Sequence, residues 1–359
     1  MKKNRKKKKR FKLFKFLLFL VIVGIGIFSW VTIKDVKAHL DIMYREDIEN
    51  VELYRSSKPR SDHFDRSIEN IAILGIDVED EDTQRSDVIM IASIDRINET
   101  VLITSILRDT VVYIPEYGLG KINAAYSYGG ASHAVATLNY NFDLDIENYV
   151  CLNFEVLVDV IDAIGGIPLE LSGEEIEELN RILGTMYDYQ KEEDFEYVDE
   201  YTSEFNGYQV LAYSRIRNLG NSDFDRTKRQ RIVIERVAEK IKFDLDYELF
   251  ENLLGAMSDN IQTSLTDREI INLAYNGYKS LDNLQMSALS DNEHIRSAEY
   301  DGMMCLIPYN LSDLMINLHT KIYGSDCCSI GQNVVDAQLA IENEIGYDSL
   351  SEIYTGSTF

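Results

Sequence analysis

Short apolar runs alternate along the middle of the chain with segments in which apolar residues recur at helical spacing. Three runs rich in β-branched residues lie close together, over residues 71–76, 88–94 and 101–107. They are apolar on both faces, which is typical of central strands that are covered by helices. Weaker strand patterns follow later in the chain, at residues 167–171, 286–289 and 304–307.

Segments with helical periodicity lie between these expected strands. Helices are predicted over residues 154–164, 223–242 and 311–323, and a capping box that begins at Thr266 predicts another. Because strands and helices alternate, the pattern predicts one α/β domain over residues 68–325, with three layers (α/β/α) around a central mixed sheet.

The N-terminal end of the chain predicts a membrane anchor. Residues 1–15 hold ten lysines and arginines and no acid, and residues 16–33 carry no charge. A helix of that length spans about 27 Å, which is enough for the core of a bilayer. Basic residues remain on the cytoplasmic side. We therefore expect a cytoplasmic segment at 1–15, a transmembrane helix at 16–33 and an extracytoplasmic remainder, as in a single-pass cell-membrane protein of a Gram-positive-type bacterium.

The apolar run has one alternative interpretation, and two further segments flank the expected domain. A cleaved signal peptide would use Val36-Lys37-Ala38 as its cleavage site, but the apolar run is long for a signal core and charged Lys34 and Asp35 follow it directly. Residues 34–67 are charged and suit a stalk between membrane and domain. Residues 326–359 form a polar, acidic tail that we expect to be loosely attached.

Charge narrows the possible partners. The whole chain carries a formal charge of −25, and beyond residue 15 there remain 26 basic against 61 acidic side chains. A surface this acidic repels nucleic acid over most of its area, so we expect no nucleic-acid partner. Four cysteines in a chain of this length do not make a disulfide scaffold.

Residues 223–231 concentrate basic side chains within this acidic protein. Arg226 and Gln230 are four residues apart, so they share one face of the expected helix. Clustered guanidinium groups suit an anion, most naturally phosphate or pyrophosphate. The solvated side of the same helix is expected to carry Lys228, Arg229 and Arg231.

Further polar residues lie at the ends of other expected elements. Arg108 and Asp109 follow the third strand, where Arg108 could grip a phosphate that Asp109 orients. Arg215 and Arg217 are two residues apart, so in an extended segment they point the same way. Taken singly, each arginine could equally be a solvated surface residue.

Two carboxylates mark the edge of the expected sheet. Asp77 ends the first strand and Asp87 opens the second, with Arg85 between them. Hard oxygen ligands of this kind suit Mg²⁺, which also takes oxygens from a bound phosphate. The alternative is that both aspartates only cap their strands. The chain has no Walker loop and no Gly-x-Ser-x-Gly elbow, which favours metal and arginine electrostatics over a covalent serine mechanism.

These motifs, in this order, resemble the LytR-CpsA-Psr family of cell-envelope proteins. The matching stretches are residues 74–77, 85–90, 105–110, 121–126, 165–167, 211–217, 225–231 and 301–308. One departure is Leu107, where the family usually has proline.

The resemblance implies a phosphotransferase on the outer face of the membrane. Such enzymes move a glycopolymer, such as teichoic acid or capsular polysaccharide, from undecaprenyl pyrophosphate to a peptidoglycan sugar. By position, Asp77 and Asp87 would hold Mg²⁺, and Asp109 is a candidate general base. Pyrophosphate binding, with stabilisation of the leaving lipid phosphate, would fall to Arg85, Arg108, Arg215, Arg217, Arg226 and Gln230.

Two other functions compete with this one, and the first of them would use the same residues. One is a pyrophosphatase that hydrolyses the polyprenyl pyrophosphate with water as the acceptor. The other is a non-catalytic envelope protein that binds glycan or regulates other components.

Overall fold

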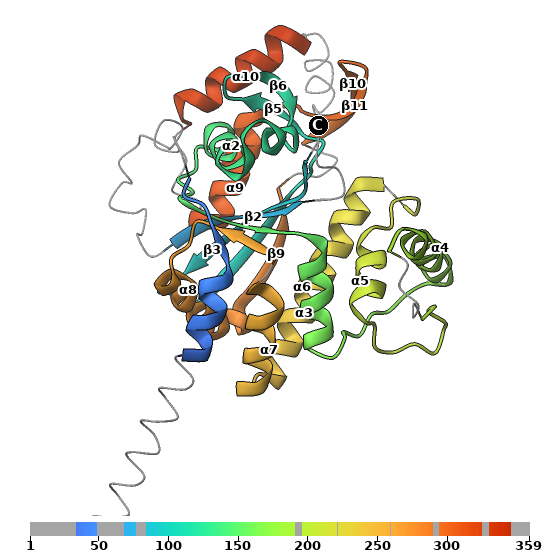
Figure 1. Cartoon of the computed structure of the whole chain (residues 1–359). Helices are drawn as coiled ribbons and strands as arrows, with labels where there is room; N and C mark the ends of the chain where they lie inside the picture. Colours follow the sequence, from blue (N-terminus) through green and yellow to red (C-terminus); the bar gives the residue numbers. More distant parts are fainter. Residues whose placement is uncertain are drawn as a thin grey trace, which may run out of the picture.

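A mixed β-sheet forms the centre of the computed structural model (Figure 1). The structure describes residues 34–48, 68–76, 84–190, 196–220, 222–258, 260–289, 294–324 and 330–345. Within them, a seven-stranded sheet has the order β1-β8-β7-β2-β3-β4-β9. In that order its strands are Tyr44–Arg45, Ile261–Thr263, Asn148–Leu152, Ile68–Ile76, Ser86–Asp95, Thr100–Ile106 and Leu284–Ala288.

The middle of this sheet is an antiparallel meander of β2, β3 and β4, flanked by parallel pairings to β7 and β9. Successive side chains of β2 point to opposite faces, so Leu74 packs in one hydrophobic cluster and Ile71 in another. Both faces are therefore buried, which explains why these strands are apolar throughout.

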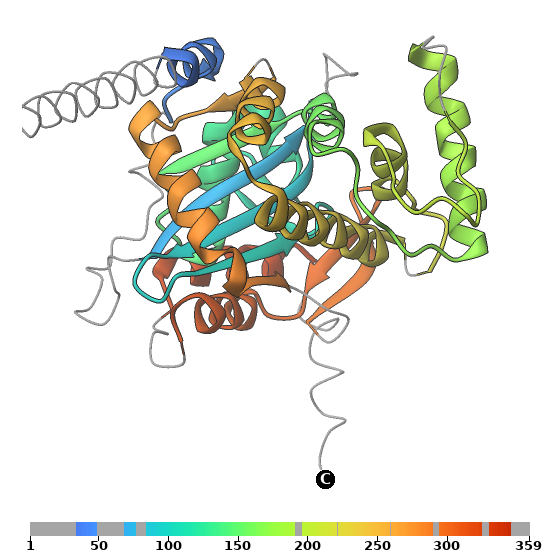
Figure 2. The same ribbon diagram turned by 90° about the horizontal axis from the view of Figure 1, so that it is seen from below.

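Helices cover the two faces. The larger cluster includes Leu138, Leu314 and Val334, which come from α2 (Ala124–Phe142), α9 (Leu311–Tyr323) and α10 (Gln332–Ile345). The opposite face contacts Ile234 of α6 (Ser222–Asp244) and Leu273 of α8 (Asp267–Ser280). Figure 1 shows α2, α9 and α10 on one side of the sheet and α8 on the other, and Figure 2 shows helices crossing in front of the strands.

A further hydrophobic cluster, separate from those on the two sheet faces, lies beside the sheet and is formed mainly by helices. We call it the helical cluster. Its members include Ile161, Leu183, Val210 and Val233, from α3, α4, α5 and α6. The bounds are Phe154–Ala163 for α3, Gly173–Gln190 for α4, Gly207–Ser214 for α5 and Tyr247–Ser258 for α7, which joins the same cluster through Leu253. In Figure 1, α4 and α5 lie to one side of the sheet.

Two hairpins complete the fold. One joins β5 (Val111–Ile114) to β6 (Gly118–Lys121), and the other joins β10 (Ile295–Tyr300) to β11 (Met303–Pro308). A short 3-10 helix, Leu281–Asn283, leads into β9.

The structure confirms a mixed α/β fold and most of the predicted elements. The three central strands, the helices over 154–164, 223–242 and 311–323, and the capping box of Thr266 with Glu269 are present. The strand predicted at 167–171 is wrong. Only Ile167 pairs, in an isolated bridge to Phe205, because the partner segment turns into α5 two residues later.

Both predicted flanking segments need correction. The stalk prediction fails for residues 34–48, since they form a helix over 34–42 and the strand β1, which pairs with β8, and they bury Leu40 and Met43. The tail is not loosely attached throughout, because α10 packs on α2 and α9 with Val334, Ala337 and Ile341 fully buried. Its acidic residues misled the prediction, since the apolar ones recur at helical spacing.

The predicted anchor at 16–33 lies outside the described residues. Among the described helices, none combines the length and apolar character that crossing a bilayer requires.

Candidate functional site

The site lies at the edge of the sheet where β2 ends, β3 begins and β4 ends. Ile76 at the end of β2 pairs with Ser86 at the start of β3, and Ile89 of β3 pairs with Ile106 at the end of β4. The residues just beyond these pairs therefore lie at the same edge of the sheet. Asp87 is the second residue of β3, and Arg108 lies in the turn after β4. Antiparallel register therefore brings a carboxylate and a guanidinium together from positions 21 residues apart.

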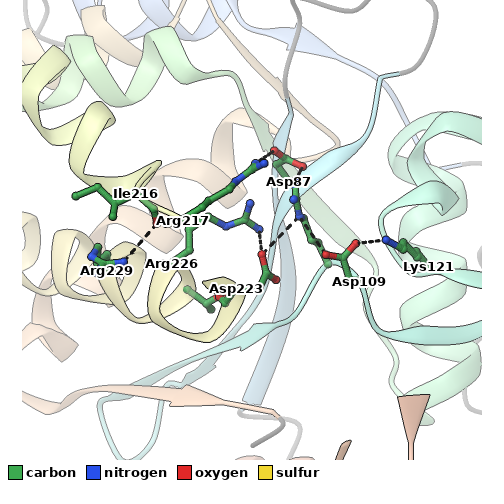
Figure 3. A network of polar contacts seen from close by, with 10 residues as sticks. Asp87, Asp109, Lys121, Ile216, Arg217, Asp223, Arg226 and Arg229 are labelled. Atoms are coloured by element: carbon green, nitrogen blue, oxygen red, sulfur yellow. Dashed lines mark hydrogen bonds and ion pairs between the residues drawn. The ribbon is translucent and has the colours of Figure 1, made fainter. Parts of the chain in front are cut away.

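Asp87 holds two arginines. One carboxylate oxygen accepts a hydrogen bond from Arg108, and the other accepts one from Arg217 at 3.4 Å (Figure 3). Arg217 lies on the loop after α5, so this contact links the sheet edge to the helical part of the molecule. Burial alone would lower the pKa of Arg108, but Asp87, with Asp223 and Asp109, raises it above its usual value.

Arg226 and Asp223 come from the first turns of α6 and face the same point (Figure 3). They form an ion pair of 2.7 Å, and Asp223 also lies 3.7 Å from Nε of Arg108. The side chain of Arg226 is only 4% exposed. Its pKa is lowered to about 10, mainly by burial and also by the nearby Arg108 and Arg217, while Asp223 opposes this shift.

Arg226 therefore keeps its charge at neutral pH, and the folded protein bears the cost of burying it. Nε of Arg226, Nε of Arg108 and Oδ2 of Asp223 are all buried without a hydrogen-bond partner within the part of the chain that is described. The two guanidinium nitrogens are donors, and unused buried donors are costly unless a ligand supplies acceptors, whereas the carboxylate oxygen is itself an acceptor. The arrangement is suited to bind an anion with several oxygens.

A cavity of about 330 Å³ opens beside these residues. It is lined on one side by Asp87, Ser214, Arg215, Arg217, Arg226 and Gln230, with Phe154, and on the other by α4 and the loop after α5, through Glu178, Arg181, Ile182, Thr185, Met186 and Asn218. Such a volume is at the lower end of the range for small-molecule sites.

The structure thus brings together most of the predicted site residues. Asp87, Arg108, Asp109, Arg217 and Arg226 share ion-pair contacts through Asp223 or directly, and Arg215 and Gln230 line the cavity.

Two predicted residues are not placed in this group. Arg85 is exposed just before β3 and does not line the cavity, and Asp77 lies outside the described residues.

Two sequence interpretations need correction. The segment around Arg215 is not extended, because α5 runs to Ser214 and Arg215 caps it, with its guanidinium 4.4 Å from the centre of the Phe154 ring. Arg229 is not solvated. It is 7% exposed, and it donates to Glu175 at 3.2 Å and to the carbonyl oxygen of Ile216 at 3.3 Å. Arg231 is half-buried, whereas Lys228 is exposed as expected.

Sequence reasoning missed Asp223 and Lys121. Asp223 lies three residues before Arg226, a spacing that places both on one helix face and could have identified it. Lys121 ends β6 and contacts Asp109 at 2.7 Å, because the hairpin pairs it with Val111. Its presence in a matching motif was the only signal, since the hairpin register cannot be read from spacing.

Metal ligands at this edge would be few. Groups of three or more carboxylate, histidine or cysteine side chains that could hold a metal do not occur among the described residues. Asp87 pairs with Arg108, and Asp109 and Asp223 each lie 3.7 Å from its Nε. One or two carboxylates plus phosphate oxygens are a donor set that Mg²⁺ accepts.

Fold and site together define an α/β protein with a cluster of arginines and aspartates at one edge of its sheet. The chain belongs to the LytR_cpsA_psr family, whose model matches residues 36–310. A polyisoprenyl-teichoic acid–peptidoglycan teichoic acid transferase TagU of Enterococcus faecalis is 32% identical over 69% of this chain and 75% of its own length.

Solved structures share the fold. Protein gbs0355 of Streptococcus agalactiae is 25% identical, with a TM-score of 0.62 over 74% of this chain and 91% of its own. YwtF (TagT) of Bacillus subtilis, solved with bound octaprenyl pyrophosphate lipid, has a TM-score of 0.52 and 21% identity over 82% and 97% of the two chains.

Proposed function

We propose that the protein is a membrane-anchored phosphotransferase that moves a glycopolymer from polyprenyl pyrophosphate to peptidoglycan outside the cell. The observation that carries this proposal is the convergence of Arg108, Arg217 and Arg226 on one point, with buried N–H groups that find no acceptor among the described residues. A pyrophosphate supplies oxygens for these donors. The teichoic acid transferase names of the relatives support the same reaction.

The reaction breaks the phosphoanhydride bond of the pyrophosphate and forms a phosphodiester bond between the glycopolymer and peptidoglycan. A sugar hydroxyl of peptidoglycan attacks the phosphorus that carries the glycopolymer, the bond from that phosphorus to the bridging oxygen breaks, and polyprenyl phosphate leaves. Negative charge grows on the leaving phosphate, where guanidinium groups fixed in advance stabilise it. Arg108 is suited to this role because Asp87 and Asp109 hold it in place.

The hydroxyl proton needs an acceptor, and we propose Asp109 or a metal-binding aspartate. Asp109 already lies between Lys121 at 2.7 Å and Arg108 at 3.7 Å. Asp109 also positions Arg108 through their ion-pair contact. The backbone of Asp109 fixes the turn after β4, because its carbonyl oxygen accepts a hydrogen bond from the N–H of Leu306 at 2.9 Å.

We further propose that Mg²⁺ assists, held by Asp87 and, by sequence, Asp77. The donor chemistry fits, since a hard cation needs only one or two protein carboxylates when substrate oxygens complete its shell. Such an ion would neutralise charge on the pyrophosphate. The anchor at 16–33 would hold the domain next to the leaflet that contains the lipid substrate. Such tethering raises the local concentration of the enzyme at its substrate.

Transfer of radiolabelled polymer by the full-length protein in liposomes tests the proposal. Polymer should appear on added peptidoglycan, with Mg²⁺, and both Arg108→Ala and Asp87→Ala should reduce this about 100-fold or more. If attachment survives both substitutions, the catalytic role is wrong. Free polymer released equally with and without peptidoglycan would instead identify a pyrophosphatase. Transfer activity that a chelator left unchanged would contradict the proposed role of Mg²⁺.

A further inference from the structure

The cavity beside the arginines has two walls of different charge. The wall from β3, α6 and the end of α5 with its following loop presents three arginines, Arg215, Arg217 and Arg226, against one aspartate, Asp87. The opposite wall is one face of α4. Helical spacing aligns Glu178, Arg181 and Thr185 along that face, and its single arginine is matched by its single glutamate.

Arg181 and Glu178 form a planar, two-point ion pair. Nε and one terminal nitrogen of Arg181 donate to the two oxygens of Glu178, both at 2.7 Å. Asn218, next to Arg217, donates to the same carboxylate at 2.9 Å. This network ties α4 to the loop that carries Arg217, so both walls are held relative to each other.

Side chains on this wall keep capacity for a ligand. Arg181 is 55% exposed on its side chain, and a guanidinium has five N–H groups, of which this pair uses two. The wall also offers an amide at Asn218 and a hydroxyl at Thr185. A neutral partner with several hydroxyl groups suits such a mixture of donors and acceptors, whereas an anion is drawn to the arginine-rich wall.

We propose that Glu178, Arg181 and Asn218 form a subsite for the first sugar of the donor, the one attached to the pyrophosphate. This inference rests on the proposed function, because that function places the pyrophosphate against Arg217 and Arg226. The sugar then extends across the cavity to α4. Ile182 and Met186 lie on the same helix but are buried in the helical cluster. We therefore assign them to the support of the wall and not to recognition of the sugar.

An ordinary explanation of the pair is a surface contact of small effect. The chain provides a matched control for it. Arg236 and Glu239 on α6 also lie three residues apart and contact at 2.8 Å, with similar exposure of the arginine, but they do not line the cavity. A true subsite should therefore respond to substitution of Arg181 and not to substitution of Arg236.

Binding of two lipids to the full-length protein in nanodiscs tests the subsite. One probe is polyprenyl pyrophosphate, and the other is the same lipid with one N-acetylhexosamine on its terminal phosphate. Arg181→Ala should weaken binding of the sugar-bearing lipid about tenfold, the effect of one charged hydrogen bond, and that of the bare lipid less than about twofold. Asn218→Ala should show the same selectivity with a smaller loss, and Arg236→Ala should change neither.

Each other outcome has a defined meaning. Equal losses for both lipids would show that α4 contacts the pyrophosphate or the lipid, and the subsite would be overturned. It would also be overturned if the wild-type protein bound both lipids equally, or if Arg181→Ala had no effect. Failure of the wild-type protein to bind the bare lipid would instead contradict the proposed function itself.

Discussion

Arg226 and Arg229 lie three residues apart on α6 and are both buried, but their surroundings differ. Arg229 uses its guanidinium on Glu175 of α4 and on the carbonyl oxygen of Ile216, so it ties the helix to the loop before it (Figure 3). Within the described part of the chain, Arg226 has one ion-pair partner, Asp223, two neighbouring arginines and a buried Nε without an acceptor. One arginine is satisfied within the fold and the other is not.

The difference separates a structural arginine from a binding one. A buried cation whose donors are filled contributes to stability only if its partners compensate for lost hydration. A buried cation with donors left over costs free energy until a ligand arrives, and so it favours the bound state. Burial alone would have assigned both residues the same role.

Arg226→Ala should give the largest effect, on activity. Loss of one fixed donor to the developing charge should lower kcat for polymer transfer about 10²–10³-fold. The free energy of unfolding should change by less than about 1 kcal/mol, because the lost ion pair with Asp223 is offset by removal of a poorly satisfied buried charge. Transfer assays and urea unfolding of the same preparation measure both quantities.

Arg226→Lys serves as the control for charge alone. A lysine keeps the charge but loses the planar fork, so it should recover only a minor part of the activity. Unfolding that became easier by several kcal/mol in Arg226→Ala would show that this arginine is structural, and the distinction drawn above would fail.

Arg229→Ala should show the opposite profile. It removes a buried partner of Glu175 and of the Ile216 carbonyl, which should lower the free energy of unfolding by about 2 kcal/mol. The expected loss is below that of a fully buried pair because the side chain of Glu175 is 22% exposed. At 15 °C, where the variant remains folded, kcat should stay within a few-fold of wild type; a loss like that of Arg226→Ala would place Arg229 in the site.

Local pattern predicted the central fold well because burial and periodicity agree there. The strands β2, β3 and β4 are buried on both faces and read as continuous apolar runs. The errors fall where tertiary contacts decide. Residues 34–48 join the sheet through only the two residues of β1. Helix α10 is acidic and buries one narrow apolar face. In both segments the hydrophobic pattern in the sequence is no stronger than that of a solvated segment.

The candidate site was predictable in its residue types and less so in its geometry. Asp87 and Arg108 lie at strand ends, and spacing pairs Arg226 with Gln230, so sequence reasoning reached them. It placed Arg229 on the solvated side of the helix and could not predict its buried contacts, since these depend on where Glu175 and Ile216 fall in space. Nor could it place Lys121 beside Asp109, which requires the register of the β5–β6 hairpin.

Arg215 is intermediate between the two arginines of α6 and should give the smallest effect. Its guanidinium lies over the Phe154 ring, 4.4 Å from the centroid, while its side chain also lines the cavity. An aromatic face leaves the N–H edges free, so the ring orients the guanidinium without using its donors. Arg215→Ala should weaken pyrophosphate binding about fivefold, and Phe154→Leu about threefold, because a contact of this kind contributes about 0.5–1 kcal/mol. If the ring acts through Arg215, the double variant should lose no more affinity than Arg215→Ala alone, as measured by titration calorimetry. Fully additive losses would mean that Phe154 contacts the ligand itself and does not act through Arg215. An affinity unchanged by Arg215→Ala would instead make Arg215, like Arg229, a residue whose interactions lie within the fold.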